Sequence, residues 1–212
     1  MSQTPLHDAC EKDKVSLDEI LELLNKRPDD VMKKDGRGFL PIHLACANGQ
    51  SFEVIEALMK AYPDGLKVPN NYGRLPIHWA CFKGQSFEVI DALIKEYPDG
   101  LEVRDRGGGL PIHLACANGQ SFEVIEALMK AYPDGLKVPN NYGRLPIHWA
   151  CFKGQSFEVI DALIKEYPDG LKVQDNGGGL PIHVACMRAG QSFEVIDALI
   201  KEYPNGLKLF ID

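Results

Sequence analysis

Long apolar segments are absent from the sequence, and aromatic residues make up only 8% of it. No apolar run approaches the ~20 residues that a helix needs to cross a bilayer. The first residues, MSQTPLHDAC, have neither the basic stretch nor the apolar stretch of a secretory signal. We therefore expect a cytoplasmic protein with no membrane partner.

An excess of positive charge is also absent. The chain has 23 Lys and Arg residues against 30 Asp and Glu residues, which gives a net charge of -7 at pH 7. Nucleic-acid binding draws much of its free energy from neutralising phosphates with basic side chains, so we expect no nucleic-acid partner. The content of 45% hydrophobic and 25% charged residues is typical of a soluble globular protein.

An internal repeat dominates the sequence. Leu-Pro-Ile-His recurs at a constant spacing of 35 residues, with its prolines at Pro41, Pro76, Pro111, Pro146 and Pro181. A divergent earlier copy, Thr4-Pro5-Leu6-His7, brings the number of repeats to six. A fixed period of this length is typical of stacked repeat architectures.

Each repeat is predicted to contain two helices. In the second repeat, proline begins a short helix over residues 41–47, where its missing N–H costs nothing. Residues 48–50 turn the chain, and Ser51 is a candidate N-cap for a second helix that extends to about Tyr62. Residues 63–65 end this helix, and we expect an extended loop over residues 67–74.

The copies of this motif resemble the ankyrin repeat family. Thr4-Pro5-Leu6-His7 with Ala9 matches the family signature directly, and the later copies match it as Leu-Pro-Ile-His-x-Ala. The period differs, since the family repeat has about 33 residues. The signature threonine is replaced by leucine in five repeats, which removes a side-chain cap worth about 1 kcal/mol per helix. We expect burial of the leucine to offset this loss.

The resemblance implies an all-α solenoid of six stacked helix-turn-helix repeats. We expect one elongated domain over residues 1–212, with an N-terminal capping repeat at 1–39, four internal repeats at 40–179 and a C-terminal repeat at 180–212. Because one helix pair cannot bury its apolar face alone, stability must come from stacking on neighbouring repeats.

Residues 40–101 recur without a change at 110–171. Natural repeats diverge at exposed positions, so this identity favours an engineered array. The alternative is a natural intracellular adaptor whose gene recently duplicated two repeats. Either origin leads to the same expected function, a protein-protein interaction module or scaffold without catalytic activity.

The cysteines and histidines of the repeats are predicted to be structural. Each of the six cysteines lies three residues after a signature histidine. Equivalent positions in stacked repeats are about 8–10 Å apart, beyond the ~7 Å Cα separation that a disulfide tolerates. We expect reduced core cysteines, and histidines that bind loop backbone. No repeat carries a unique polar constellation, so we expect no catalytic site, metal or cofactor.

The glycine-rich stretches 106–109 and 176–179 lack the Lys-Ser/Thr of a phosphate-binding loop. Both precede Leu-Pro-Ile-His, where the resemblance implies a hairpin turn that needs glycine at positive φ.

Positions that differ between repeats are the candidates for partner binding. The resemblance implies that loop tips and the exposed side of the first helix form a concave groove. Trp, Tyr and Arg are typical of interface hot spots, although a Trp after the signature His could instead pack on the neighbouring repeat. The candidates are Arg37, Phe39, Asn48, Asn71, Tyr72, Arg74, Trp79, Phe82, Lys83, Arg106, Asn118, Tyr142, Arg144, Trp149, Phe152, Lys153, Met187 and Arg188. The partner is an unidentified protein, and an array engineered without selection would have none.

The last repeat does not have the polar character of a capping repeat, because its second helix matches those of internal repeats. We predict that Leu209, Phe210 and Ile211 cover its apolar face. The alternative is weak end-to-end self-association, as in a self-assembling structural array.

Overall fold

The computed structural model describes residues 3–188 and 190–210, which contain helices and no strand. The predicted all-α class is therefore confirmed. The chain divides into two compact units, Met1–Arg106 and Gly107–Asp212, called here the N-terminal and C-terminal units. Within the described residues, no helix is long and apolar enough to cross a membrane.

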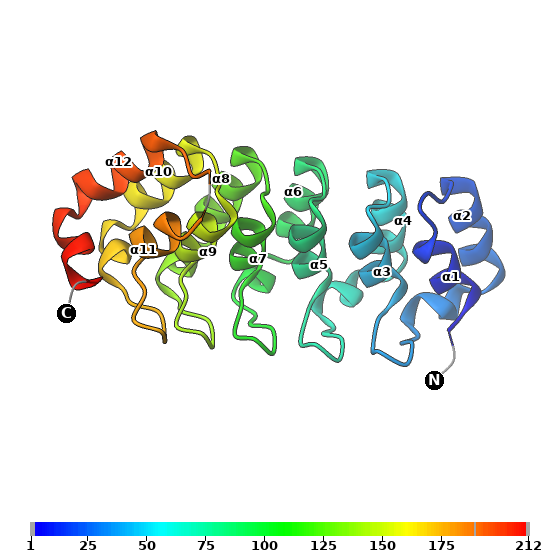
Figure 1. Cartoon of the computed structure of the whole chain (residues 1–212). Helices are drawn as coiled ribbons and strands as arrows, with labels where there is room; N and C mark the ends of the chain where they lie inside the picture. The colour runs from blue at the N-terminus through cyan, green and yellow to red at the C-terminus, as the bar shows by residue number, and fades with distance from the viewer. Residues whose placement is uncertain (1–2, 189, 211–212) are drawn as a thin grey trace. The chain divides into compact units, whose positions relative to one another are not determined.

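Each unit contains three helix pairs, and a short 3₁₀ helix follows every pair (Figure 1). The N-terminal unit consists of α1 (Pro5–Glu11), α2 (Leu17–Lys26), η1 (Pro28–Met32), α3 (Pro41–Asn48), α4 (Phe52–Ala61), η2 (Pro63–Lys67), α5 (Pro76–Lys83), α6 (Phe87–Glu96) and η3 (Pro98–Leu101). The C-terminal unit consists of α7 (Pro111–Asn118), α8 (Phe122–Ala131), η4 (Pro133–Lys137), α9 (Pro146–Lys153), α10 (Phe157–Glu166), η5 (Pro168–Lys172), α11 (Pro181–Cys186), α12 (Phe193–Glu202) and η6 (Pro204–Phe210).

The helix ends follow the predicted signals. Proline begins α3, and Gly49 ends it in the left-handed conformation with φ of 72°. The N-cap of α4 is Ser51, as predicted, and the equivalent Ser86 accepts a hydrogen bond from a backbone N–H of α6. The segment after α4 differs from the prediction, because Pro63 starts η2 before the chain becomes extended at Val68.

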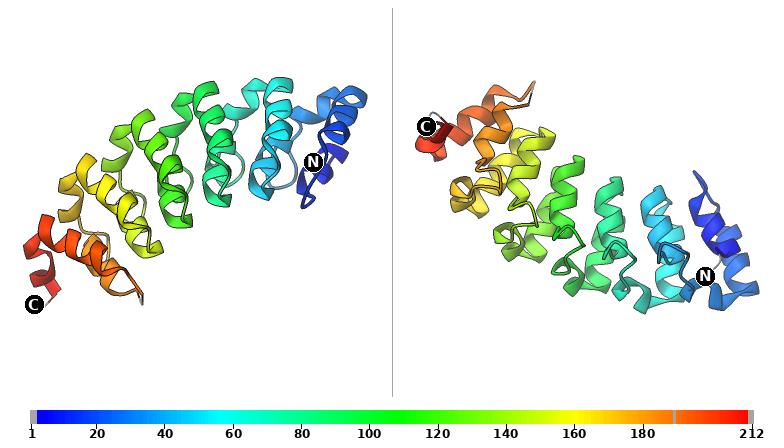
Figure 2. Two further views of the ribbon diagram at one scale, coloured as in Figure 1. Left: turned by 90° about the horizontal axis from the view of Figure 1, so that it is seen from above. Right: turned by 60° about the horizontal axis from the view of Figure 1, so that its bottom comes forward.

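Within each unit the first helices pack on one another, and so do the second helices. In the N-terminal unit, α3 packs against α1 and α5, and α4 packs against α2 and α6. In the C-terminal unit, α9 lies between α7 and α11, and α10 lies between α8 and α12. The two rows can be followed within each unit in Figure 2.

The leucines that replace the signature threonine are buried core residues, and Leu40 is a representative example. Its backbone N–H donates to Nδ1 of His43 at 3.1 Å. The histidine half of the capping interaction is therefore kept, and leucine adds apolar burial as expected.

Glutamines that follow first helices hold adjacent repeats together, and Gln50 is an example. Nε2 of Gln50 donates to the carbonyls of Cys10 at 3.3 Å and Lys12 at 2.5 Å, and its Oε1 accepts from the N–H of Val15 at 3.1 Å. Gln155 repeats the contact with the carbonyl of Cys116 at 3.2 Å in the C-terminal unit. These buried amides satisfy carbonyl groups at the ends of the preceding helices. The recurrent Gly-Gln pair is the signal for this role, which the sequence interpretation treated only as a turn.

Candidate functional site

Hairpin loops before each first helix place the predicted partner-binding residues. An Asp or Asn recurs at the start of these loops, and its side chain closes the turn. Oδ1 of Asn70 accepts from the N–H groups of Tyr72 at 2.9 Å and Arg74 at 3.1 Å. Oδ1 of Asp175 accepts from Gly177 and Gly179, each at 2.9 Å. These are Asx turns, whose side chains stand in for backbone hydrogen-bond partners.

Glycine at positive φ completes the hairpins, as predicted for the glycine-rich stretches. Gly108 has φ of 73° and Gly178 has φ of 80°. A Cβ added at Gly108 would lie 2.8 Å from the backbone nitrogen of Asn141, so the neighbouring hairpin also excludes a side chain here.

Adjacent hairpins are tied by backbone hydrogen bonds. In the N-terminal unit, Asn71 N–H donates to the Arg37 carbonyl at 3.1 Å, and Arg106 N–H donates to the Tyr72 carbonyl at 3.0 Å. Asn176 makes the same contact with the Tyr142 carbonyl at 2.9 Å in the C-terminal unit. The loop tips therefore form an ordered row within each unit.

Two of the predicted arginines are held in nearly identical arrangements. Nε of Arg74 donates to Oδ2 of Asp105 at 2.9 Å, and its guanidinium lies 4.9 Å from the Trp79 ring centroid. Each guanidinium is thus fixed by a carboxylate on one side and an indole on the other.

The copy in the C-terminal unit repeats these contacts. Nε of Arg144 donates to Oδ2 of Asp175 at 2.9 Å, and the guanidinium lies 5.1 Å from the Trp149 ring. Burial opposes ionisation of Asp175, but hydrogen bonds from Arg144 and from the N–H groups of Gly179 and Gly177 lower its pKa overall.

Aromatic side chains gather around the arginine of the N-terminal unit. The ring of Phe39 lies 5.1 Å from Trp79 and 6.1 Å from Tyr72, and Trp79 meets Phe82 edge to face at 5.7 Å. Phe39 itself is buried, so it supports this cluster from below, whereas Phe82 is 43% exposed. Arg74 also covers Phe82, at 5.4 Å.

A pocket of about 370 Å³ opens beside this cluster. Its walls include Arg37, Phe39, Asn48, Tyr72 and Trp79 among the predicted residues. The structure therefore brings five of the candidates to one site. Its other lining residues are Glu11, Leu44 and Ala47.

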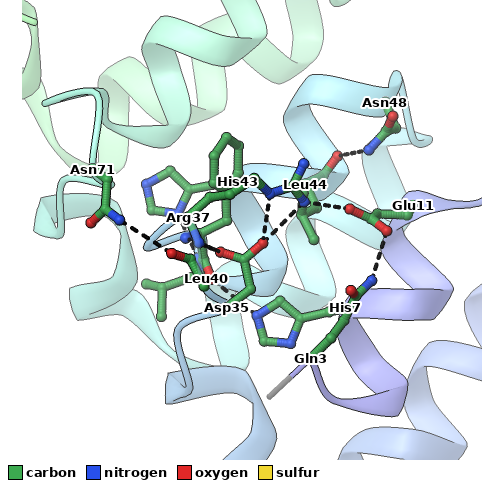
Figure 3. Close-up of polar contacts among 12 residues, drawn as sticks. Gln3, His7, Glu11, Asp35, Arg37, Leu40, His43, Leu44, Asn48 and Asn71 are labelled. Atoms are coloured by element: carbon green, nitrogen blue, oxygen red, sulfur yellow. Dashed lines mark hydrogen bonds and ion pairs between the residues drawn. The ribbon is translucent and has the colours of Figure 1, made fainter. Parts of the chain in front are cut away.

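Two carboxylates hold Arg37 at the edge of this pocket (Figure 3). Its guanidinium lies 2.5 Å from Glu11 and 3.0 Å from Asp35, and Gln3 donates to Glu11 at 2.7 Å. The sequence interpretation missed both acidic residues. The signal for Asp35 was the Asp or Asn that recurs at the start of each hairpin.

A second pocket, of about 320 Å³, lies in the C-terminal unit. Arg144, Phe152, Val184, Met187 and Arg188 line it, and four of these were predicted partner-binding residues. The described residues that line it include no acidic side chain.

The remaining predicted residues are distributed around these two sites. Asn48 and Asn118 donate back to the carbonyls of Leu44 and Leu114, so their amides are used within the helix. Five further candidates that do not line either pocket are exposed: Asn71, Lys83, Arg106, Tyr142 and Lys153.

The indole nitrogens of Trp79 and Trp149 are buried and have no hydrogen-bond partner among the described residues. These tryptophans therefore contribute packing to the repeats. The phenylalanines beside them, Phe82 and Phe152, offer the exposed apolar surface.

Four signature histidines bind backbone carbonyls through Nε2, as expected: His7, His78, His148 and His183. Nε2 of His43 is buried with no hydrogen-bond partner among the described residues. Nδ1 of His148 accepts from the N–H of Leu145 at 3.2 Å, so its Nε2 carries the proton toward the Val173 carbonyl at 3.1 Å. Burial lowers the pKa of His148 to about 4 and that of His43 to about 3. These rings are therefore neutral at pH 7, and the described residues contain no cluster of metal-ligating side chains.

Five of the six free cysteines are buried, as predicted, and burial raises the pKa of the Cys151 thiol to about 12. The prediction was wrong for Cys186, which is exposed. It is the last residue of α11.

The sequence and the fold were compared with those of known proteins. The family model of ankyrin repeats, three copies, matches residues 6–106, 87–175 and 112–208. No curated protein matches the sequence. A chain in the solved complex of the Bd0816 predatory endopeptidase from Bdellovibrio bacteriovorus with immunity protein Bd3460 is similar in fold. The TM-score is 0.76 at 23% sequence identity, over 95% of this chain and 99% of that chain. The family match extends over almost the whole sequence, so this chain belongs to the ankyrin repeat family.

Proposed function

We propose that this chain is a non-catalytic protein-recognition module that binds its partner through the hairpin tips and first helices of its repeats. The observation that carries the proposal is the stack of an arginine on a tryptophan and a phenylalanine, which the described residues show once in each unit. Arg74 covers Trp79 and Phe82, and Arg144 covers Trp149 and Phe152.

The stacks have the composition and order of interface hot spots. Arginine and large aromatic residues contribute most of the binding free energy at protein interfaces. Phe82 is 43% exposed and Phe152 is 51% exposed, so each presents apolar area that a partner can cover. The carboxylates of Asp105 and Asp175 fix the guanidinium groups beforehand, which reduces the entropy lost on binding.

Family membership supports this reading, because ankyrin repeats are protein-protein interaction modules. The fold neighbour was solved in a complex with another protein, which is consistent with the same use of the fold. The exact repetition of residues 40–101 supports an origin by duplication, whether engineered or within a natural gene.

Capture experiments with a matched pair of variants test the proposal. The double variant Phe82→Ala/Phe152→Ala removes the two exposed rings. Phe193→Ala is the control, because Phe193 is 82% exposed but lies on α12, a second helix. All three proteins should melt within a few degrees of one another, since the altered rings are exposed.

We expect proteins captured by the wild type to be retained by the Phe193→Ala variant and lost by the double variant, as measured by quantitative mass spectrometry. Equal capture by the wild type and the double variant would contradict the proposed surface. Absence of any captured protein would support an array without a selected partner.

Exposed apolar residues of the last repeat favour self-association as a second candidate. Met187 and Phe193 are 81% and 82% exposed. The side chains of Leu209, Phe210 and Ile211, which were predicted to cover this end, lie outside the described part of the chain. Analytical ultracentrifugation of the protein truncated after Lys208 tests both ideas: a capping tail predicts lower stability or self-association of the truncated chain, whereas an unchanged monomer contradicts a capping role.

A further inference from the structure

We propose that the pocket between α9 and α11 binds an acidic side chain of a partner protein that is flanked by apolar residues. This inference rests on the proposed function and names the chemistry of one part of the surface. The pocket of about 320 Å³ is lined by Arg144, Phe152, Val184, Met187 and Arg188.

At this pocket the last repeat departs from the alternation of the earlier ones. The residue after the signature histidine is leucine or tryptophan in repeats two to five, but it is Val184 in repeat six. The smaller side chain leaves unfilled volume beside the Phe152 ring of the preceding repeat. Phe152, Val184 and Met187 make the walls apolar, so the pocket favours a residue with an apolar stem or apolar neighbours.

Two guanidinium groups give the pocket its charge. Arg144 is paired with Asp175, which lies outside the pocket lining, and its guanidinium also lies 5.9 Å from the Phe152 ring. This contact orients Arg144 without placing a carboxylate in the pocket itself.

Arg188 supplies a positive charge that is not paired with a carboxylate among the described residues. Its NH1 donates to the carbonyl of Phe152 at 2.8 Å, near the C-terminal end of α9, and the side chain passes over Gly154. A helix C-terminus stabilises a nearby cation, which explains this position. The guanidinium has five N–H donors, and among the described residues no carboxylate pairs with it.

The positive charge and the apolar walls of the pocket both indicate an acidic residue beside an apolar one as its occupant. A carboxylate between the two arginines would accept charge-assisted hydrogen bonds, which are stronger than neutral ones. The net charge of the protein is -7, so attraction of an acidic group must come from this local arrangement. An aspartate or glutamate would accept hydrogen bonds from the guanidinium groups, and an apolar residue next to it would pack against the apolar walls.

A random-peptide phage library panned against the full-length protein tests the inference. We expect enrichment of Asp or Glu beside an apolar residue. The best peptide is then synthesised with its acidic residue and with the corresponding amide, and both are titrated by fluorescence anisotropy. The acidic form should bind at least about tenfold more tightly, consistent with the loss of one charge-assisted hydrogen bond.

Arg188→Gln should weaken binding of the acidic peptide about tenfold and leave the amide peptide unaffected, whereas Arg188→Lys should weaken binding less. Lys201→Gln is the control, because Lys201 has a 72% exposed side chain but lies on α12, a second helix outside the proposed surface. It should change the affinity less than about twofold.

Selected peptides without acidic residues, or affinities insensitive to Arg188→Gln, would overturn the inference. Such peptides would still support the proposed function if Phe82→Ala/Phe152→Ala abolished their binding. Peptides unaffected by all of these variants would contradict both proposals.

Discussion

The two copies of the duplicated block have the same sequence but different surroundings. Residues 40–101 follow a hairpin that ends in Arg37-Gly38-Phe39, and residues 110–171 follow one that ends in Gly107-Gly108-Gly109. In the first copy, the Phe39 ring contacts both Tyr72 and Trp79. Tyr72 is 50% exposed, whereas its equivalent Tyr142 is 63% exposed.

This difference shows that a side chain from the neighbouring repeat can change which side chains a repeat exposes. The arginine-indole stack is the same in both copies, because Arg, Trp and the pairing Asp are all kept. Among the described residues, Phe39 contacts Tyr72 and Trp79 in the first copy, whereas the ring contact in the second copy is between Trp149 and Phe152. Recognition surfaces of such arrays can therefore be changed one repeat away from the residues that contact the partner.

Acidification should destabilise both units, and the combined loss from the two histidines is the largest expected effect. The pKa of His43 is about 3 and that of His148 about 4 in the folded state, against ~6.5 when unfolded. The unfolded chain therefore binds more protons below pH 6.5, so stability falls as pH falls through this range. Between pH 7 and pH 5 each histidine should lower the free energy of unfolding by about 2 kcal/mol.

Urea unfolding at the two pH values measures this loss in each unit. The variant Trp149→Phe leaves Trp79 as the fluorescent reporter of the N-terminal unit, and Trp79→Phe leaves Trp149 as the reporter of the C-terminal unit. Unchanged midpoints at pH 5 would show that the histidines are not held neutral by burial.

Changes at Phe39 and at the equivalent Gly109 should reverse the difference in aromatic packing between the two copies. Phe39→Ala removes a buried ring from the N-terminal cluster and should lower stability by about 3 kcal/mol. Gly109→Phe places a ring at the equivalent position of the C-terminal unit. If it reproduces the cluster around Trp149, it should add about 1 kcal/mol.

Chemical denaturation of both variants, followed by circular dichroism, checks these values. Loss of stability in the Gly109→Phe variant would mean that the C-terminal unit lacks space for the ring, and that the contrast depends on more than this one residue.

Removal of the charge of Asp105 or Asp175 should lower stability equally in the two copies. This is the smallest of the three expected effects. Asp105→Asn and Asp175→Asn keep the side-chain oxygen that closes the turn but remove the charge opposite Arg74 or Arg144. Each should lower the free energy of unfolding by about 1 kcal/mol or less, because these pairs are partly exposed. Double-mutant cycles with the paired arginine measure the coupling, and a difference between the copies above about 1 kcal/mol would contradict their equivalence.

The sequence by itself determined the repeat, the helix pairs and most of the core. Its period placed proline at each helix start and glycine at each hairpin, and these residues act through local backbone geometry. Local signals of this kind can be read from one repeat alone. The same reasoning also selected arginines and aromatics that the structure brings to two pockets.

Only the tertiary structure decided how these residues divide between packing and exposure. Phe39 lies beneath the aromatic cluster, the tryptophan nitrogens are buried, and Cys186 is exposed although the five equivalent cysteines are buried. The pairing of Arg74 with Asp105 joins residues of different repeats, and the pocket beside Arg188 is also lined by residues of different repeats. The sequence pattern of a single repeat does not contain these facts, because burial and pairing depend on the side chains that the adjacent repeat places against it.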